Sequence, residues 1–169
     1  MCKTKPAARD ARGFFIVFFL LGVSFLFGCS SQQTAPSADR ARADEVVFNT
    51  MQQVGKPYRY GGSSPQTGFD CSGLIQYAYR NAAGLAVPRT VAALYTAPYP
   101  TVNREQLQSG DIVIFATGWR NKPDHAGIYV GDERFVHAPS SGGKVRIDPL
   151  HSGYWQSRFL TGKRVLLAR

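Results

Sequence analysis

The stretch GFDCSGL, residues 68–74, decides how this 169-residue chain is organised, because a loop ends and a helix begins inside it. The loop before it, from Tyr58 onward, is rich in glycine and proline, which is typical of turns. After it, CSGLIQYAYRNAAG repeats apolar residues at helical spacing and closes on a glycine. We therefore expect a helix from Cys71 to Gly84, with a cysteine in its first turn.

Two more helices are expected, one on either side of this one. The segment ADEVVFNTMQQVG, residues 43–55, places Val47, Met51 and Val54 on one helical face and has acidic residues in its first turn. The segment RTVAALYTA predicts a short helix that is capped by Thr90. All three predicted helices lie in the first part of the folded region.

The second half of the chain changes to short segments of β-branched residues that end at turns. These segments are GDIVIF (110–115), HAGIYVG (125–131), RFVHA (134–138), KVRID (144–148) and SRFLTGKRVLL (157–167). Helices followed by successive strands predict an α+β fold, in which N-terminal helices pack on an antiparallel β-sheet.

The position of Cys71 indicates a reactive thiol. The first backbone N–H groups of a helix have no partner within the helix, and the helix dipole adds partial positive charge there. Both effects favour the thiolate, so we expect a lowered pKa and a nucleophilic sulfur at Cys71. The same N–H groups would bind an oxyanion that forms on attack. The alternative is a buried and inert cysteine at a helix start.

A thiol hydrolase also needs a base, which is usually a histidine. His125 begins one predicted strand and His137 lies in the next, and the turn GDE between them would form a hairpin. One histidine would then face the thiol, while the other would bind its second ring nitrogen and fix its tautomer. His151 lies in a turn-like segment and is expected at the surface. The alternative for each histidine is a structural role.

The N-terminus resembles the signal of a bacterial lipoprotein. A basic start precedes GFFIVFFLLGVSFLF, which is shorter than the roughly 20 residues of a membrane span. The following LFGC resembles a lipobox, which implies that residues 1–28 are removed and that Cys29 is lipidated. Residues 29–43 would be a flexible tether and residues 44–169 the catalytic domain. The alternatives are an uncleaved N-terminal anchor and a short buried helix with a chance cysteine.

This resemblance also gives an expected location and an expected cysteine chemistry. Ser30 after the lipidated residue resembles an outer-membrane address, so the protein would be lipid-anchored in the outer membrane and face the periplasm. Cys71 would then be the one remaining thiol of the mature chain, so no intramolecular disulfide is expected.

The formal net charge of +9 favours an anionic partner. We expect no nucleic acid as a partner of an exported protein, whereas an anionic cell-wall polymer or lipid head groups fit the charge. The alternative is ordinary surface charge that serves solubility.

Four segments together resemble the NlpC/P60 family of cell-wall cysteine peptidases: PYRYGGSSPQTGFDCSGL, LQSGDIVIF, DHAGIYVGDERFVHAP and YWQSRFLTGKRVL. The resemblance covers about residues 46–167 and is closest to short Gram-negative lipoprotein members. It implies a minimal papain-like fold, with Cys71 as nucleophile, His125 as general base and His137 as the residue that orients His125. It also implies that Tyr58 lies near the thiol and helps to bind the oxyanion or the substrate.

The resemblance implies further properties of the site. Asp70 and Ser72 would contact a free amine of the substrate or shape the site. The reaction would be hydrolysis of peptidoglycan stem peptides at amide bonds that involve D-residues and meso-diaminopimelate, with a preference for the crosslink. No cofactor and no metal ion are expected. Because uncontrolled hydrolysis of the wall is lethal, we expect regulation, although no motif for an adaptor protein is visible.

Three alternative functions remain at this point. The first is a wall-binding lipoprotein that has this fold and no activity. The second is a thiol amidase or acyltransferase on a related papain-like scaffold. The third is a metal site of Cys71, His125 and His137, which is disfavoured because the sequence has no closely spaced ligand pair.

Overall fold

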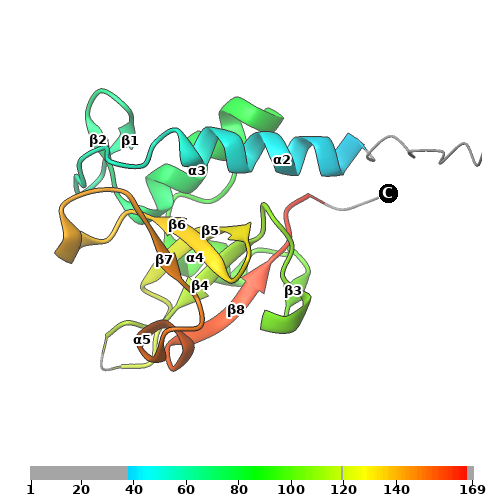
Figure 1. Ribbon diagram of the computed structural model, residues 1–169, viewed down its shortest axis with the longest axis vertical. Coiled ribbons are helices and arrows are strands. Elements are labelled where there is room, and N and C mark those ends of the chain that lie inside the picture. Colours follow the sequence, from blue (N-terminus) through cyan, green and yellow to red (C-terminus); the bar gives the residue numbers. More distant parts are fainter. Residues whose placement is uncertain (1–37, 119, 167–169) are drawn as a thin grey trace, which may run out of the picture. The chain divides into compact units, whose positions relative to one another are not determined.

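The computed structural model describes residues 38–118 and 120–166 of the chain. These residues have the predicted α+β fold, in which helices lie along an antiparallel sheet (Figure 1). Within them, no helix is both long and apolar enough to cross a membrane. The predicted signal, Cys29 and the first part of the predicted tether lie outside the described residues.

Helix α2 (Ala38–Met51) begins earlier than the predicted segment 43–55. The added residues, 38–42, include two alanines and two arginines, which favour helix, and the next residue, Ala43, is buried against the domain. The last part of the predicted tether, residues 29–43, is therefore helical from residue 38 onward.

The buried face of α2 differs from the predicted one. The predicted stripe through Val47 is wrong, because Met51 and Val54 are 39% and 41% exposed. The buried residues of this helix are Ala43, Val46 and Thr50. The hydroxyl of Thr50 donates a hydrogen bond to the carbonyl of Val46, 2.6 Å away, so a polar residue is satisfied on the inner face. A periodicity count that used apolar residues alone could not find this face.

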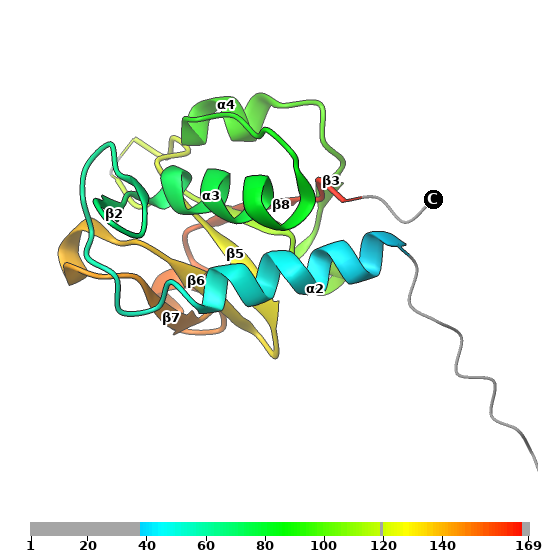
Figure 2. The same ribbon diagram turned by 90° about the horizontal axis from the view of Figure 1, so that it is seen from above.

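The central helix and the helix after it are as predicted. Helix α3 (Cys71–Ala83) ends at Gly84, whose φ of 66° places it in the left-handed region. Helix α4 (Val91–Thr96) is capped by Thr90, whose hydroxyl accepts the N–H of Ala93. Helices α2 and α3 pack against each other, and seen from above α3 lies between α2 and α4 (Figure 2).

The main sheet has six strands in the order β3-β8-β4-β5-β6-β7, and all neighbouring strands are antiparallel. All five predicted strands are present. The sixth strand, β3, was not predicted, and it is only two residues long. The strands are β3 (Thr101–Val102), β4 (Ile112–Phe115), β5 (His125–Gly131), β6 (Arg134–His137), β7 (Arg146–Pro149) and β8 (Phe159–Lys163). The smaller elements are β1 (Ser63–Ser64), β2 (Gly68–Phe69), η1 (Arg104–Gln106), η2 (Ser140–Gly142) and α5 (Gly153–Gln156).

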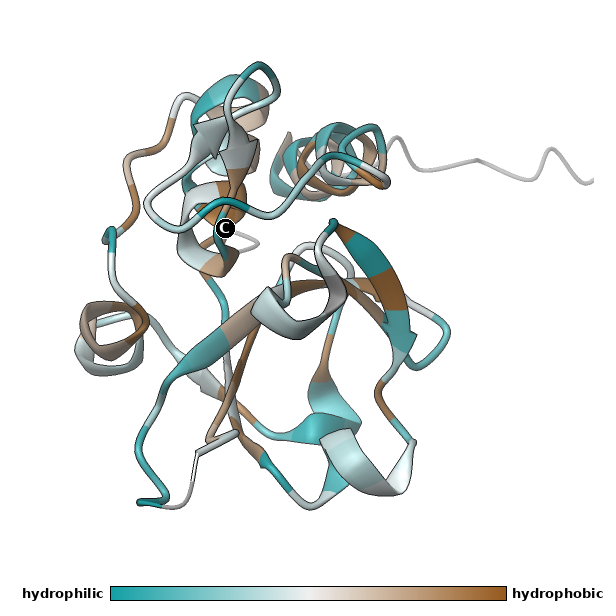
Figure 3. Cartoon of the chain, turned by 90° about the vertical axis from the view of Figure 1, so that its left-hand side faces the viewer, coloured by the Kyte–Doolittle hydropathy of each residue, from teal (hydrophilic) through white to brown (hydrophobic). Residues whose placement is uncertain are grey.

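A hydrophobic core joins the helices to the sheet. Ile75 and Tyr79 of α3 are fully buried against Ile112 and Ile114 of β4 and Ile128 of β5. Figure 3 shows hydrophobic residues on strands of the sheet and on the helices, and hydrophilic residues on many of the connecting loops. This core therefore holds α3 at a fixed position on the sheet.

The loop before α3 rests directly on the first turn of that helix. The carbonyl of Gly62 accepts the N–H of Asp70 and lies so close to Gly73 that a Cβ there would be 2.0 Å from the carbonyl oxygen. Gly73 in the motif DCSG is therefore required by this close approach, and the loop has one position relative to Cys71.

Candidate active site

Asp70 fixes the start of helix α3. Its carboxylate accepts the backbone N–H of Gly73 at 2.7 Å and the backbone N–H of Gly61 at 2.9 Å. Asp70 is thus the N-cap, and Cys71 is the first helical residue. The thiol of Cys71 is half-buried at this helix start.

The surroundings of the Cys71 thiol raise its pKa above the ordinary value. Burial is the main cause, and the carboxylate of Asp70 adds to it. Hydrogen bonds from the backbone N–H groups of Ala126 and Ser72 act in the opposite direction without reversing the shift. The expectation of a lowered pKa from the helix start alone is therefore wrong. At rest the thiol keeps its proton, and a base must remove it before attack.

Two histidines lie together beside the start of β5, as the hairpin predicted. Nε2 of His125 is 2.8 Å from Nδ1 of His137. Strands β5 and β6 pair through Ile128 and Val136, and the turn between them places both rings on one face. A Cβ at Gly127 would be 2.7 Å from the carbonyl oxygen of Val136 and 3.1 Å from Cβ of His137, so the glycine leaves room for the second ring.

Both histidines are neutral at pH 7. Burial lowers the pKa of His125 to about 4 and that of His137 to about 3. The indole of Trp155 stacks on the ring of His125, with 5.5 Å between centroids and 25° between planes. A neutral imidazole is a proton acceptor, so His125 has the protonation state that a general base needs.

Asp148 on β7 continues the row of groups behind His137. Nε2 of His137 lies 3.0 Å from Oδ2 of Asp148, although the ring N–H points away from the line between the two atoms. Asp148 also accepts hydrogen bonds from Arg146 and from the indole N–H of Trp155, each at 3.0 Å. The sequence prediction did not include these three residues. Arg146 and Asp148 are two residues apart in the predicted strand 144–148, so their side chains lie on the same face of the sheet. This spacing could have indicated an ion pair next to the histidines.

Tyr58 lies near the thiol, as expected. It pairs with Phe69 in an isolated β-bridge, and the N–H of Arg59 donates to the carbonyl of Phe69. Burial raises the pKa of Tyr58, and the charges of Cys71 and Asp70 add to the shift, so the three groups share one neighbourhood. A contact of Tyr58 with the substrate stays a prediction.

Arg89 binds both polar neighbours of Cys71, and no pattern in the sequence pointed to it. Its guanidinium donates to the two carboxylate oxygens of Asp70 at 2.8 and 2.7 Å and to the hydroxyl of Ser72 at 2.7 Å. Burial alone would raise the pKa of Asp70, but the hydrogen bonds from Arg89 and Gly73 hold it below its ordinary value. With its backbone donors, Asp70 fills the roughly four acceptor sites of a carboxylate. The geometry therefore assigns Asp70 and Ser72 a shaping role at rest, and their contact with substrate stays a prediction.

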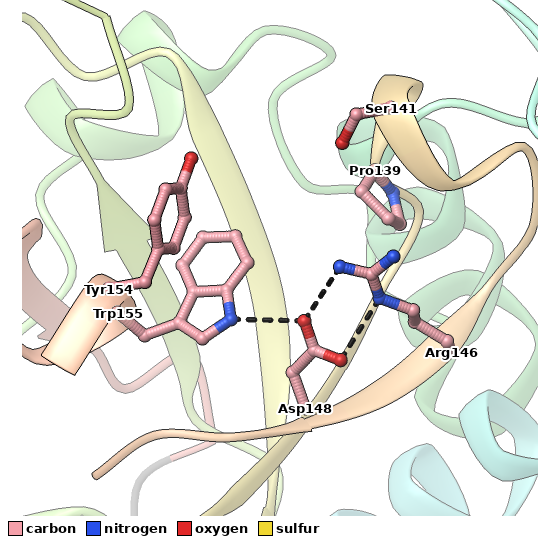
Figure 4. Close-up of a pocket in the computed structure, with 6 residues that line it drawn as sticks. All are labelled: Pro139, Ser141, Arg146, Asp148, Tyr154 and Trp155. Carbon is pink, nitrogen blue, oxygen red and sulfur yellow. Dashed lines mark hydrogen bonds and ion pairs between the residues drawn. The ribbon is translucent and has the colours of Figure 1, made fainter. Parts of the chain in front are cut away.

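A cavity of about 400 Å³ opens beside the histidines. In Figure 4 the guanidinium of Arg146 and the indole of Trp155 approach Asp148 from opposite sides, and Tyr154 stands next to the indole. Pro139 and Ser141 complete its lining.

The remaining predicted positions add little to this site. His151 is exposed, as expected. Within the described part of the chain, no group of three or more His, Cys, Asp and Glu side chains is arranged to hold a metal ion.

Comparison with known proteins gives a consistent family assignment. Residues 55–164 match the NlpC/P60 family. Murein DD-endopeptidase MepH of Escherichia coli (strain K12) is 43% identical over 78% of this chain. Gamma-DL-glutamyl hydrolase of Bacillus subtilis (strain 168) is 41% identical over 76% of the chain. The chain spans 49% of the length of the first relative and 30% of the second.

A solved structure gives the same result for the fold. The crystal structure of an NlpC/P60 family protein from Bacillus cereus ATCC 10987 superposes with a TM-score of 0.68 at 29% identity, covering 74% of this chain and 40% of that one.

Proposed function

Since the chain belongs to the NlpC/P60 family, we propose that it is a cysteine-type endopeptidase that hydrolyses amide bonds in peptidoglycan stem peptides. The observation on which the proposal depends is the meeting of two parts of the fold. The start of α3 supplies the thiol of Cys71, which lies against the backbone N–H of Ala126, and the adjacent residue, His125, is held by His137.

The first half of the reaction forms a thioester. His125 takes the proton of the Cys71 thiol, and the sulfur attacks the carbonyl carbon of the amide. The backbone N–H of Cys71 at the helix start is a donor for the resulting oxyanion, and the hydroxyl of Tyr58 is a second candidate. His125 then returns the proton to the leaving amine, and the C–N bond breaks.

The second half releases the product. His125 removes a proton from water, the hydroxide adds to the thioester carbon, and the C–S bond breaks. The thiolate regains a proton, so the free enzyme is restored and one water is consumed for each amide that is cut. The neutral state of His125 at pH 7 suits both proton transfers.

The bond that we propose is the crosslink between stems, in line with the name of the relative MepH. Without residues 1–28 the chain has sixteen Lys and Arg and ten Asp and Glu, and this net charge of +6 supports an acidic stem peptide as substrate. We propose in addition that Cys29 is lipidated and holds the enzyme on the outer membrane, facing the periplasm, as the LFGC motif indicates.

The test is to incubate the full chain with purified sacculi and to identify the released muropeptides by mass spectrometry. The parent should convert crosslinked dimers to monomers. Cys71→Ala should reduce the rate to that of a blank, because the nucleophile is removed. Asp132→Asn, at a side chain that is 85% exposed in the hairpin turn, is the matched control and should keep full activity.

Each other outcome has a defined meaning. Release of stems shortened to a dipeptide would move the cut to the bond between D-Glu and diaminopimelate. Full activity of Cys71→Ala would overturn the proposal. Binding of the parent to sacculi without any product would support a wall-binding function.

A further inference from the structure

The row of polar groups does not end at His137. Asp148, on the neighbouring strand β7, contacts Nε2 of His137, whereas His125 contacts Nδ1 of the same ring. We infer that Asp148 is a positioning residue, which fixes the tautomers of both histidines so that the ring nitrogen of His125 that faces Cys71 is a free proton acceptor. This role presupposes the hydrolysis proposed above.

The first step of the argument concerns the proton on His137. An ionised carboxylate only accepts hydrogen bonds. Nε2 of His137 lies 3.0 Å from Oδ2 of Asp148, and a bare nitrogen lone pair at that distance would repel the carboxylate. The proton of neutral His137 therefore belongs on Nε2, even though the contact is bent at rest.

The second step follows from the contact between the rings. With its proton on Nε2, His137 has no proton on Nδ1, so Nδ1 can only accept a hydrogen bond. The atom 2.8 Å away is Nε2 of His125, so this nitrogen donates and has the proton of His125. Nδ1 of His125 is then bare, as a general base requires. The opposite tautomer would have its proton on Nδ1, and this nitrogen could not take the thiol proton.

The third step concerns what holds Asp148 in place. Oδ2 of Asp148 faces three donors: Nε2 of His137, the indole N–H of Trp155 and Nη2 of Arg146. Oδ1 accepts one hydrogen bond, from Nε of Arg146. These contacts lower the pKa of Asp148, so the carboxylate is ionised at neutral pH and is a fixed acceptor.

The asymmetry of these contacts makes two substitutions informative. In Asp148→Asn, the amide oxygen should turn toward the three donors, so His137 would still find an acceptor. In Asp148→Ala, no acceptor remains, and both tautomers of each histidine become accessible. If Asp148 served only packing, the two variants would not differ in the tautomers of the histidines.

The first experiment reads the tautomers directly and does not need substrate. The full chain, labelled with ¹⁵N-histidine and kept reduced at pH 7, is studied by long-range ¹H–¹⁵N correlation NMR. His125 and His137 should both appear as the neutral form with the proton on Nε2, while the exposed His151 is an internal reference. Asp148→Asn should keep this pattern, and Asp148→Ala should mix it. A proton on Nδ1 in the parent, or an unchanged pattern in Asp148→Ala, would overturn the inference.

The second experiment measures kinetics on sacculi, with Asp132→Asn as the control. Asp148→Ala should lower kcat by about 10²-fold, the order of magnitude of general-base catalysis, with a small change in KM. Asp148→Asn should stay within about tenfold of the parent, since its oxygen keeps the acceptor. Equal losses in the two variants would overturn the inference. If the parent itself releases no product, the proposed function fails, whereas the NMR result still decides whether Asp148 fixes the tautomers of the two histidines.

Discussion

At the scale of single residues, the two histidines of the site are buried without a charge. His125 is 9% exposed and His137 is fully buried, and burial lowers the pKa of each. In an unfolded chain, both histidines would have a pKa of about 6.5. Folding therefore keeps protons off these rings over a range of acidic pH, which links the site to the stability of the whole domain.

This linkage predicts how stability changes with pH. Above about pH 6.5 both states of the chain have neutral histidines, so their contribution to stability is complete. As the pH falls from there toward about 4, the unfolded state binds protons that the folded state excludes, and His125 alone should cost about 3 kcal/mol. Urea unfolding of the Cys71→Ala protein at several pH values between 7.5 and 4 measures this loss.

The matched control is His125→Gln, which should reduce the pH dependence in the same range by the share of His125 and leave the share of His137. The pKa values of Asp70 and Asp148 are lowered, so their contribution to stability is lost only below about pH 5, and the effect of the histidines is read above that pH. Stability that is constant between pH 6.5 and 4.5 would contradict buried neutral histidines.

The sequence predicted Cys71, His125 and His137 as one group, because a helix start and a hairpin turn are local signals. It did not predict the direction of the pKa shift at Cys71, since burial depends on the distant strand β5 that covers the thiol. Arg89 was also missed, because its pairing with Asp70 depends on the path of the chain after α3.

At the scale of elements, the loop before α3 is as important for the site as the helix. The carbonyl of Gly62 rests on Gly73, and the N–H of Gly61 binds Asp70. The first turn of α3 is thus held from outside the helix as well as from inside. Pattern analysis predicted the turn-rich loop but not this contact, because an interaction between two backbones leaves no periodicity in side chains.

This contact predicts the effect of Gly73→Ala. A Cβ 2.0 Å from the carbonyl oxygen of Gly62 must displace the loop, and overpacking of this kind costs about 1–3 kcal/mol. Activity should fall further than stability, because Asp70 and Cys71 move with the helix start. Thermal unfolding and the sacculus assay measure the two effects.

Gly153→Ala in α5 is the control for this substitution, since a Cβ there meets nothing within 4 Å. It should keep the stability of the parent. Equal stability of the Gly73 and Gly153 variants would contradict the prediction, because it would show that the loop around Gly62 moves without a cost in free energy.

At the scale of the whole molecule, the site exists only when helices and sheet are packed together. The helix α3 provides the thiol, the hairpin of β5 and β6 provides both histidines, and the core between them includes Ile75 and Ile128. The predicted class of fold is confirmed because helix and strand periods occupy separate halves of the sequence. The prediction of the buried face of α2 was wrong because two of its three inner residues, Ala43 and Thr50, are small or polar.

This arrangement predicts that structure and activity are lost together. Ile75→Ala removes a fully buried side chain from the core and should destabilise the domain by about 2–5 kcal/mol. In urea, the loss of helical circular dichroism and the loss of hydrolysis should share one midpoint, shifted to lower urea in the variant. Hydrolysis that persists beyond the structural transition would contradict this coupling.

The half-buried thiol at the start of α3 has a consequence for chemical durability. Peroxides oxidise thiolates far faster than thiols, first to the sulfenic acid and then to forms that cannot be restored. Because burial raises the pKa of Cys71, the resting enzyme exposes little thiolate to such oxidants. In the proposed mechanism, the sulfur becomes electron-rich only while His125 holds its proton, during turnover. Damage by hydrogen peroxide should therefore follow the number of catalytic cycles rather than the age of the protein.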